Sequence, residues 1–570
     1  MAGTLDKSFG TNGYTTSNFG GNFGSTPNAQ VIDSNNCTIV TGQIQDKTTN
    51  IDKLYIAKYT STGVLDKNFG GGKGYIIGDY YTGQGSVGKS LVLDGSGNII
   101  VTGYANNDEG AERLLLAKYY SNGEIYKGFG GDKGWITSDF GYSSKDYSSS
   151  GGSVTLDSSG RVIVGGIVSI STGAGGSIES ILAGYDTYGN LDKDFGGNGT
   201  GWSNITNSDI NGKEFSKIVI EKNTGSIIVL GKNVIGKPDA DTPIITKFDS
   251  EGVLYTNFGG DKGYILTKDG SKYSGINIYS DIVLDGSNHI IFTSSDVYTA
   301  GLLLVSYNSS DGSLDRNFGE NRGYTVATIP NYYSGGGSLV IDSNNRIIVT
   351  GTLLNTDQTI FKTLLARYSS EGKLDKTFGG QGLGYSITSF GDLNLSFGTA
   401  VSLDNNGLII VSVSAYVSKR GLVSFIARYF NENNEPICLP AGTPILTDQG
   451  LLAIEKIDIK KHTINHKRIV AITTTISPEK HLVCFEANSM GINCPTQRTL
   501  MTPGHEVLYK GKLVQAKHFV GRLTGVHTVP YNGKDVLYNV LQEQHGLMRV
   551  NNMVLETLHP ENKVAKEHFL

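Results

Sequence analysis

Short apolar runs separated by polar turns recur along most of the chain, from residue 3 to about residue 430. The clearest copy is Val92–Gly103, in which VLDGSGNIIVTG places a polar turn between two apolar strands. The apolar runs are short, and no stretch keeps the 3.6-residue period of an amphipathic helix. The pattern therefore predicts β-strands joined by Gly, Asp, Asn and Ser turns.

A second motif, with variants of Leu-Asp-Lys-x-Phe-Gly, recurs seven times in step with these strands. Its phenylalanines are spaced 60, 60, 66, 63, 60 and 60 residues apart, at Phe9, Phe69, Phe129, Phe195, Phe258, Phe318 and Phe378. Seven units of about four strands each predict a seven-bladed β-propeller. An open solenoid would need polar capping repeats, and neither end of this array resembles one.

Two side chains of the repeat have expected structural roles. We expect each recurrent Phe to wedge between neighbouring blades, with the following Gly making a turn that a β-carbon would block. A recurring acid is expected to cap backbone N–H groups of a hairpin turn. Its positions are Asp33, Asp94, Asp157, Glu221, Asp285, Asp342 and Asp404. Calcium binding is the alternative, but it requires several converging oxygens at each site.

The composition changes sharply after residue 437. Nine of the ten histidines and three of the four cysteines lie in the last 133 residues. A chain of 570 residues is also too long for one core. We therefore predict a propeller at 1–430, a polar linker at 431–437 and a second, smaller all-β domain at 438–570.

Charge and hydropathy exclude several classes of protein. The net charge of −5 and the absence of a basic stripe argue against a nucleic-acid partner. No apolar run is long enough for a membrane span. The start of the chain lacks the apolar segment of a signal peptide, and four cysteines form no disulfide framework. We expect a protein synthesised in the cytoplasm.

The second domain opens with Cys438-Leu-Pro-Ala-Gly-Thr443 and later carries a Thr-x-x-His block at Thr502 and His505. A strand near Tyr538 reads Val-Leu-Tyr-Asn. Together these features resemble the Hint domain of inteins and Hedgehog-type autoprocessing proteins, which implies a compact all-β horseshoe. The upstream repeats resemble the delta-60 repeat family, which is assigned to β-propellers.

The Hint resemblance implies catalytic roles for Cys438, Thr502 and His505, and a cleavage site at Ile437–Cys438. The Cys438 sulfur attacks the Ile437 carbonyl and exchanges an amide for a thioester, an N-to-S acyl shift. The sulfur is a good nucleophile only as thiolate. His505 supplies a proton to the departing nitrogen, and Thr502 hydrogen-bonds the scissile amide.

The end of the sequence departs from the splicing pattern. Splicing inteins end in His-Asn followed by a Cys, Ser or Thr acceptor, whereas His559-Pro-Glu-Asn562 is followed by Lys563. The eight residues after Asn562 also form no sterol-recognition extension. We therefore expect a single-turnover cleavage that releases the propeller or transfers it to an acceptor nucleophile.

The alternative is a structural or adhesive propeller with a non-cleaving Hint domain, on a particle or virion surface. Its Gly/Tyr-rich loops would bind an unknown protein or glycan. A propeller enzyme lacks support, because His289 is the propeller's one histidine. No cofactor and no metal are expected: Cys484, Cys494 and His481 do not match a zinc ligand set. The remaining histidines are expected at the surface or satisfied, at His518, His527 and His545.

Overall fold

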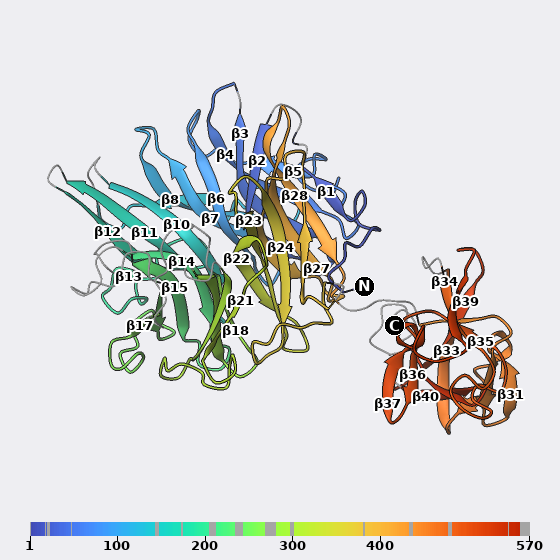
Figure 1. Ribbon diagram of the computed structural model, residues 1–570. Helices are drawn as coiled ribbons and strands as arrows, with labels where there is room; N and C mark the ends of the chain where they lie inside the picture. The colour runs from blue at the N-terminus through green and yellow to red at the C-terminus, as the bar shows by residue number, and fades with distance from the viewer. Residues whose placement is uncertain are drawn as a thin grey trace. The chain divides into compact units, whose positions relative to one another are not determined.

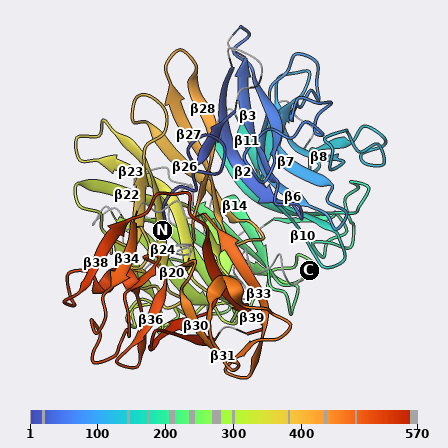
Figure 2. The ribbon, with the colours of Figure 1, turned by 90° about the vertical axis from the view of Figure 1, so that its right-hand side faces the viewer.

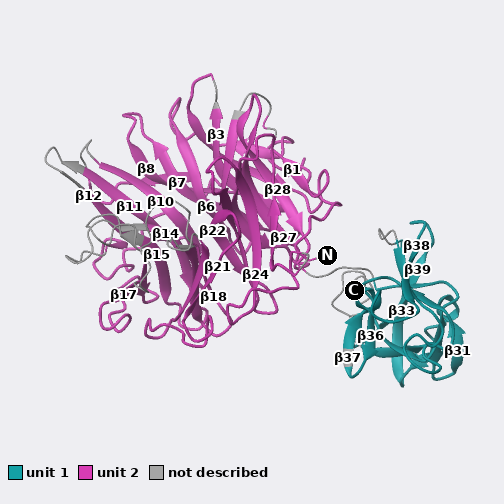
Figure 3. Ribbon diagram, viewed as in Figure 1, with its two compact units in different colours: residues 1, 433–570 teal, residues 2–432 magenta. Residues whose placement is uncertain are grey.

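The computed structural model describes residues 2–17, 19, 23–46, 48–142, 147–172, 175–204, 213–233, 243–267, 281–296, 301–379, 382–431, 437–476, 481–544 and 546–558. Residues 432–436 of the predicted linker, His545 and the segment from His559 to Asn562 lie outside this set. The chain folds into two compact units, Ala2–Glu432 and Asn433–Leu570 (Figure 3). No helix among the described residues is long and apolar enough to cross a membrane.

The first unit consists of seven four-stranded antiparallel sheets in its described residues (Figure 1). The first three sheets contain β2 (Phe23–Ile32), β3 (Thr38–Asp46), β4 (Asp52–Tyr59) and β5 (Tyr75–Ile77); β6 (Ser86–Leu93), β7 (Ile99–Asn106), β8 (Glu112–Tyr119) and β9 (Trp135–Ser138); and β10 (Tyr147–Leu156), β11 (Val162–Thr172), β12 (Gly175–Tyr185) and β13 (Trp202–Asn204). The next three contain β14 (Lys213–Ile220), β15 (Ile227–Asn233), β16 (Pro243–Phe248) and β17 (Tyr264–Leu266); β18 (Asp281–Leu284), β19 (His289–Asp296), β20 (Gly301–Asn308) and β21 (Tyr324–Ala327); and β22 (Tyr332–Ile341), β23 (Ile347–Asn355), β24 (Phe361–Tyr368) and β25 (Tyr385–Thr388).

The seventh sheet closes the ring. It joins the first strand of the chain, β1 (Tyr14–Thr16), to β28 (Gly421–Tyr429), β27 (Ile409–Val417) and β26 (Ser396–Leu403). In this sheet Tyr14 pairs with Ala427, and the strands of the seventh sheet lie beside β2 of the first (Figure 2). Each sequence unit therefore gives its first strand to the preceding blade, and closure leaves no free sheet edge at the seam. The predicted fold class is confirmed.

The recurrent phenylalanines lie between blades, as expected. All seven side chains are at most 1 % exposed, and a β-carbon on Gly63 of the first blade would meet the Phe9 ring at 2.9 Å. The glycine after each Phe donates its N–H to a turn carbonyl of the next blade at 2.7–3.1 Å. These bonds join Gly10 to Thr62, Gly70 to Asn122, Gly130 to Tyr188, Gly196 to Glu251, Gly259 to Asp311, Gly319 to Glu371 and Gly379 to Ala2. The last of them closes the ring.

The six recurring aspartates cap turns, whereas the Glu221 carboxylate accepts hydrogen bonds from the Thr224 hydroxyl at 2.6 Å and from Lys247 Nζ at 3.0 Å. Asp94 Oδ1 accepts the backbone N–H groups of Ser96 and Asn98 at 3.0 and 2.9 Å, and the same pattern holds at Asp33, Asp157, Asp285, Asp342 and Asp404. Most of these carboxylates also face a cation, as Lys118 Nζ faces Asp94 at 3.0 Å. The turn interpretation explains these acids without calcium.

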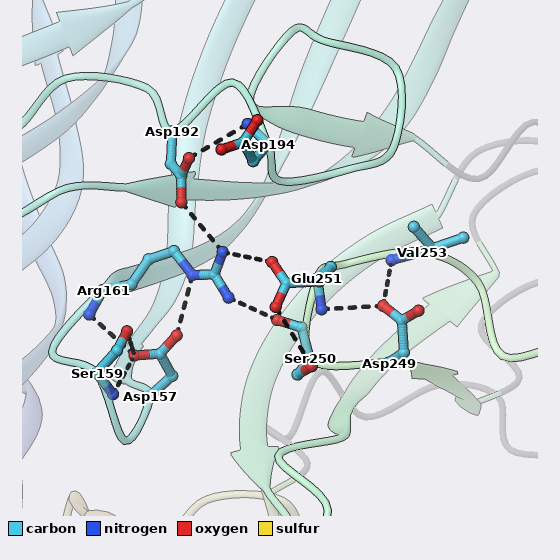
Figure 4. A network of polar contacts seen from close by, with 9 residues as sticks. All are labelled: Asp157, Ser159, Arg161, Asp192, Asp194, Asp249, Ser250, Glu251 and Val253. Atoms are coloured by element: carbon cyan, nitrogen blue, oxygen red, sulfur yellow. Dashed lines mark hydrogen bonds and ion pairs between the residues drawn. The ribbon is translucent and has the colours of Figure 1, made fainter.

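In most blades a Lys or Arg on a strand, such as Lys118, supplies the cation. In the third blade the cation comes from a turn instead. Gly184 stands where other units have Lys118 or Arg428, and a β-carbon built there would lie 2.6 Å from the Phe195 ring. Arg161 instead places its guanidinium 5.1 Å from the centre of that ring. It bonds Asp157, Asp192 and, in the fourth blade, Glu251 at 2.8–3.0 Å (Figure 4). The cationic position over the aromatic ring is thus kept by a different residue.

The second unit has three sheets among its described residues. One is ordered β29 (Leu439–Pro440), β39 (Leu537–Gln542), β33 (Lys467–Thr475) and β32 (Thr463–Ile464). A six-stranded sheet is ordered β31 (Gly450–Ala453), β30 (Pro444–Thr447), β40 (Leu547–Val550), β41 (Met553–Glu556), β36 (Glu506–Tyr509) and β37 (Lys512–Gln515). The third is β35 (Thr499–Met501), β34 (His481–Phe485) and β38 (Val526–Pro530), and two 3₁₀ turns, η1 (Ile454–Lys456) and η2 (Ala516–Phe519), complete the unit.

One apolar core joins these sheets. It includes Leu439, Ile469, Val483, Met501 and Leu555, all fully buried, which come from β29, β33, β34, β35 and β41. Because these strands are far apart in the sequence, their packing brings together the strand ends that carry the candidate site.

Replacing Arg428 by alanine tests the ring closure. Arg428 Nη2 lies 2.7 Å from Asp6 Oδ2, and both side chains are less than 10 % exposed. The variant leaves a buried carboxylate without its cation and should lose about 3–5 kcal/mol of unfolding free energy. The measurement is urea unfolding followed by tryptophan fluorescence, since both tryptophans, Trp135 and Trp202, lie in the propeller.

Lys53→Ala is the matched control. Its partner Asp79 is 65 % exposed, so this loss should stay below about 1 kcal/mol. Equal losses in the two variants would contradict the closing role of Arg428.

Candidate functional site

The three predicted catalytic residues sit just outside strand ends of the second unit. Cys438 precedes β29, Thr502 follows β35 and His505 precedes β36. The Thr502–His505 segment is a tight turn, in which the His505 N–H donates to the Thr502 carbonyl at 3.1 Å. Strand positions therefore fix the backbone of all three residues.

Thr502 holds the backbone of Cys438. The Cys438 N–H donates to Thr502 Oγ1 at 2.8 Å, and the Thr502 N–H donates to the Cys438 carbonyl at 3.0 Å. The Thr502 hydroxyl also donates to that carbonyl at 3.3 Å. Thr502 is fully buried. The nitrogen of the Ile437–Cys438 peptide bond is thus held by a hydroxyl from another sheet.

Asn539 holds the other end of the same peptide bond. Its Nδ2 donates a hydrogen bond to the Ile437 carbonyl oxygen, and its Oδ1 accepts the Val540 N–H at 2.8 Å. In the antiparallel pair of β29 and β39, Leu439 lies opposite Tyr538. This register places Asn539 opposite Cys438, beside the Ile437 carbonyl. The Asn539 side chain is fully buried. A neutral amide donor therefore points at the oxygen that would become negative during attack on this carbonyl.

The Cys438 thiol lies in an apolar setting. Cys438 is 6 % exposed and packs with Leu482 and Leu537. Burial raises the pKa of the thiol to about 12, so the sulfur is protonated at neutral pH. The neighbouring Ile437 side chain packs against a separate apolar cluster that contains Ala471, Leu541 and Leu558.

His505 is a buried neutral imidazole. Its Nε2 lies 3.2 Å from the Glu556 carbonyl oxygen. Because a carbonyl only accepts, Nε2 carries the proton and Nδ1 keeps its lone pair. Among the described residues Nδ1 has no hydrogen-bond partner. Burial lowers the pKa of His505 to about 4, while the backbone of Glu556 and of Cys438 acts in the opposite direction.

A pair of carboxyl groups adjoins His505. Glu556 Oε1 accepts the Glu506 N–H at 3.0 Å, and β36 pairs with β41 beside it. Burial, together with the nearby Glu506 charge, raises the pKa of Glu556 to about 7. The backbone carbonyl that orients His505 therefore belongs to a residue that titrates near neutral pH.

The structure brings half-buried Ile437 together with the buried residues Cys438, Thr502 and His505. It also adds two residues that the sequence did not assign. Asn539 follows Tyr538 in the strand that carried the resemblance, but a single Asn in a strand gives no sign of its partner. Glu556 acts through its backbone carbonyl, which no side-chain pattern reveals.

The sequence does not predict a metal site at Cys484, Cys494 and His481. Within the described residues, Cys484 gathers with Glu486 and His527 rather than with Cys494 and His481. His527, expected to be a satisfied or surface residue, is half-exposed and lies 3.9 Å from Glu486.

Comparison with known families identifies the second unit. Residues 437–562 match the family model described as the Hint domain. The chain therefore carries a C-terminal Hint domain. No curated protein sequence matches the chain.

Several solved structures resemble the chain at low sequence identity. Semaphorin 2a of Drosophila is 8 % identical, with 97 % of each chain covered and a TM-score of 0.40. The β-propeller domain of the Trilobed protease from Pyrococcus furiosus is 8 % identical, with 72 % of this chain and 97 % of that chain covered and a TM-score of 0.35. A protein of unknown function from Dyadobacter fermentans is 10 % identical, with 60 % and 94 % covered and a TM-score of 0.35. These likenesses are weak, and the propeller assignment rests on the seven sheets themselves.

Proposed function

We propose that the Hint domain cuts its own chain at Ile437–Cys438 by an N-to-S acyl shift. The observation that carries this proposal is the anchoring of one peptide bond at both ends. Thr502 Oγ1 accepts its N–H at 2.8 Å, and Asn539 Nδ2 donates to its carbonyl oxygen. An ordinary linker peptide needs neither contact, whereas a reacting amide needs a fixed orientation and a donor for the developing oxyanion.

The shift proceeds through a five-membered ring, because the Cys438 sulfur is four bonds from the Ile437 carbonyl carbon. His505 Nδ1 takes the thiol proton as the sulfur attacks. The oxyanion of the tetrahedral intermediate accepts a hydrogen bond from Asn539 Nδ2. His505 then returns the proton to the Cys438 nitrogen as the C–N bond breaks. The products are a thioester between Ile437 and Cys438 Sγ and a free Cys438 amine.

The resting site disfavours a charged pair of Cys438 thiolate and His505 imidazolium. The pKa values of about 12 for Cys438 and about 4 for His505 differ by about eight units, so complete proton transfer before attack would cost on the order of 10 kcal/mol. We therefore propose that proton transfer accompanies attack, so that the thiolate–imidazolium pair does not form first. The apolar setting of the thiol makes a slow, single-turnover reaction the expected behaviour.

The second step releases the propeller. Water, a small nucleophile or an amine of another protein attacks the thioester and separates residues 1–437 from 438–570. We propose that the first fragment is a delta-60-type propeller of residues 1–430 with a linker at 431–437. In this scheme the ring is the cargo and the Hint domain is the release device.

Intact-mass analysis of the purified chain beside Cys438→Ala tests the cleavage. With hydroxylamine, the wild type should yield 438–570 and a 1–437 fragment that carries a terminal hydroxamate, because hydroxylamine attacks thioesters. Cys438→Ala should stay whole, and Cys494→Ala, the matched control, should cleave like the wild type. If the wild type also stays whole, the proposed cleavage is contradicted. The alternative, a propeller that acts as a binding or structural module, is then favoured.

The pH dependence of the rate tests His505. At a hydroxylamine concentration that no longer limits the reaction, the wild-type rate should change less than about threefold from pH 6 to pH 8. The reason is that the His505 base is already unprotonated above about pH 4. His505→Gln must rely on the thiolate fraction, which grows about tenfold per pH unit below the thiol pKa. A wild-type rate that also climbs tenfold per unit would remove His505 from the role of base.

A further inference from the structure

Three metal-binding side chains converge at the end of the β34–β38 strand pair. Cys484 in β34 pairs directly with His527 in β38, so their side chains share one face of the sheet. Glu486 lies two residues beyond Cys484 and returns to the same face. Their ligand atoms lie within 4.8 Å of one another, in the one such group of three found among the described residues.

Two of the three distances between these atoms are close to those of a tetrahedral metal centre. Cys484 Sγ lies 3.3 Å from Glu486 Oε1, and His527 Nε2 lies 3.9 Å from the same oxygen. Zinc bonds of about 2.0–2.3 Å place tetrahedral ligand atoms about 3.3–3.8 Å apart. The three donors are therefore close to ligating positions without any movement of the strands.

Arg498 shows that the group attracts a cation. Its Nε lies 3.2 Å from Cys484 Sγ and 3.5 Å from Glu486 Oε1. The Arg498 side chain is 56 % exposed, so it can turn away into solvent. Glu486 and His527 are 44 % and 51 % exposed, which leaves these two donors accessible to an ion from solution, while Cys484 is buried.

We propose that Cys484, Glu486 and His527 bind a Zn²⁺-class divalent ion, with water as the fourth ligand and Arg498 as the competing cation. A thiolate and an imidazole favour zinc over magnesium or calcium, which prefer oxygen ligands. On binding, the Cys484 thiol releases one proton to solvent and its sulfur donates an electron pair to the metal. The thiolate and carboxylate together balance the two positive charges. This site does not depend on cleavage at Cys438.

Cobalt(II) is the probe, used with the full-length Cys438→Ala chain so that cleavage cannot intervene. Titration should give a thiolate-to-cobalt charge-transfer band and the visible bands of tetrahedral cobalt, and Zn²⁺ should displace both. Cys484→Ser should abolish the charge-transfer band, and His527→Ala should weaken binding at least about tenfold. Arg498→Ala should tighten binding about fivefold, because it removes a unit charge from beside the ion.

Cys494→Ser is the matched control, since Cys494 is the other thiol of this unit besides Cys438 and is partly exposed. It should keep the spectrum unchanged. The absence of a charge-transfer band in the parent chain, or a band that survives Cys484→Ser, would overturn the proposal. Circular dichroism of each variant confirms that a lost band reflects lost ligands and not an unfolded domain.

Discussion

The anchoring of the Ile437–Cys438 peptide bond is the constraint around which the second unit is arranged. The pairing of β29 with β39 supplies Asn539, and the end of β35 supplies Thr502. These residues are about 40 positions apart in the sequence and come from different sheets. The apolar core that packs those sheets together is therefore what holds one peptide bond at its nitrogen and at its oxygen.

The same burial sets the reactivity of the site. It fixes Cys438 and His505, and it also moves their pKa values apart, so that the resting pair is a neutral thiol and a neutral imidazole. Under the proposed mechanism, such a site would react only when attack and proton transfer occur together.

The repeat predicted the propeller because ring packing imposes the same demand on every blade. The repeat positions of Phe69 and Asp94 recur because each blade needs an aromatic side chain between blades and a capped turn. The offset between repeat and blade could not be predicted, because β1 joins β28 only once the ring closes. Gly184 and Arg161 show the same limit: the cation that other blades take from a strand comes, in the third blade, from a turn.

The Hint resemblance singled out Cys438, Thr502 and His505 as candidate catalytic residues, and the structure places them near one peptide bond. The partners of those residues could not be predicted. Asn539 acts through strand register, Glu556 acts through its backbone, and His527 reaches Cys484 only by cross-strand pairing. Each of these contacts depends on tertiary structure and leaves no local pattern in the sequence.

The most direct test of the anchored peptide is the hydroxylamine-trapped cleavage rate of Asn539→Ala. The account predicts a rate about 10²–10³-fold below that of the wild type, because the oxyanion loses its amide donor. Asn532→Ala, in an exposed turn just before β39, should cleave at the wild-type rate. An Asn539→Ala chain that cleaves as fast as the wild type would contradict the claim that this contact prepares the bond for attack.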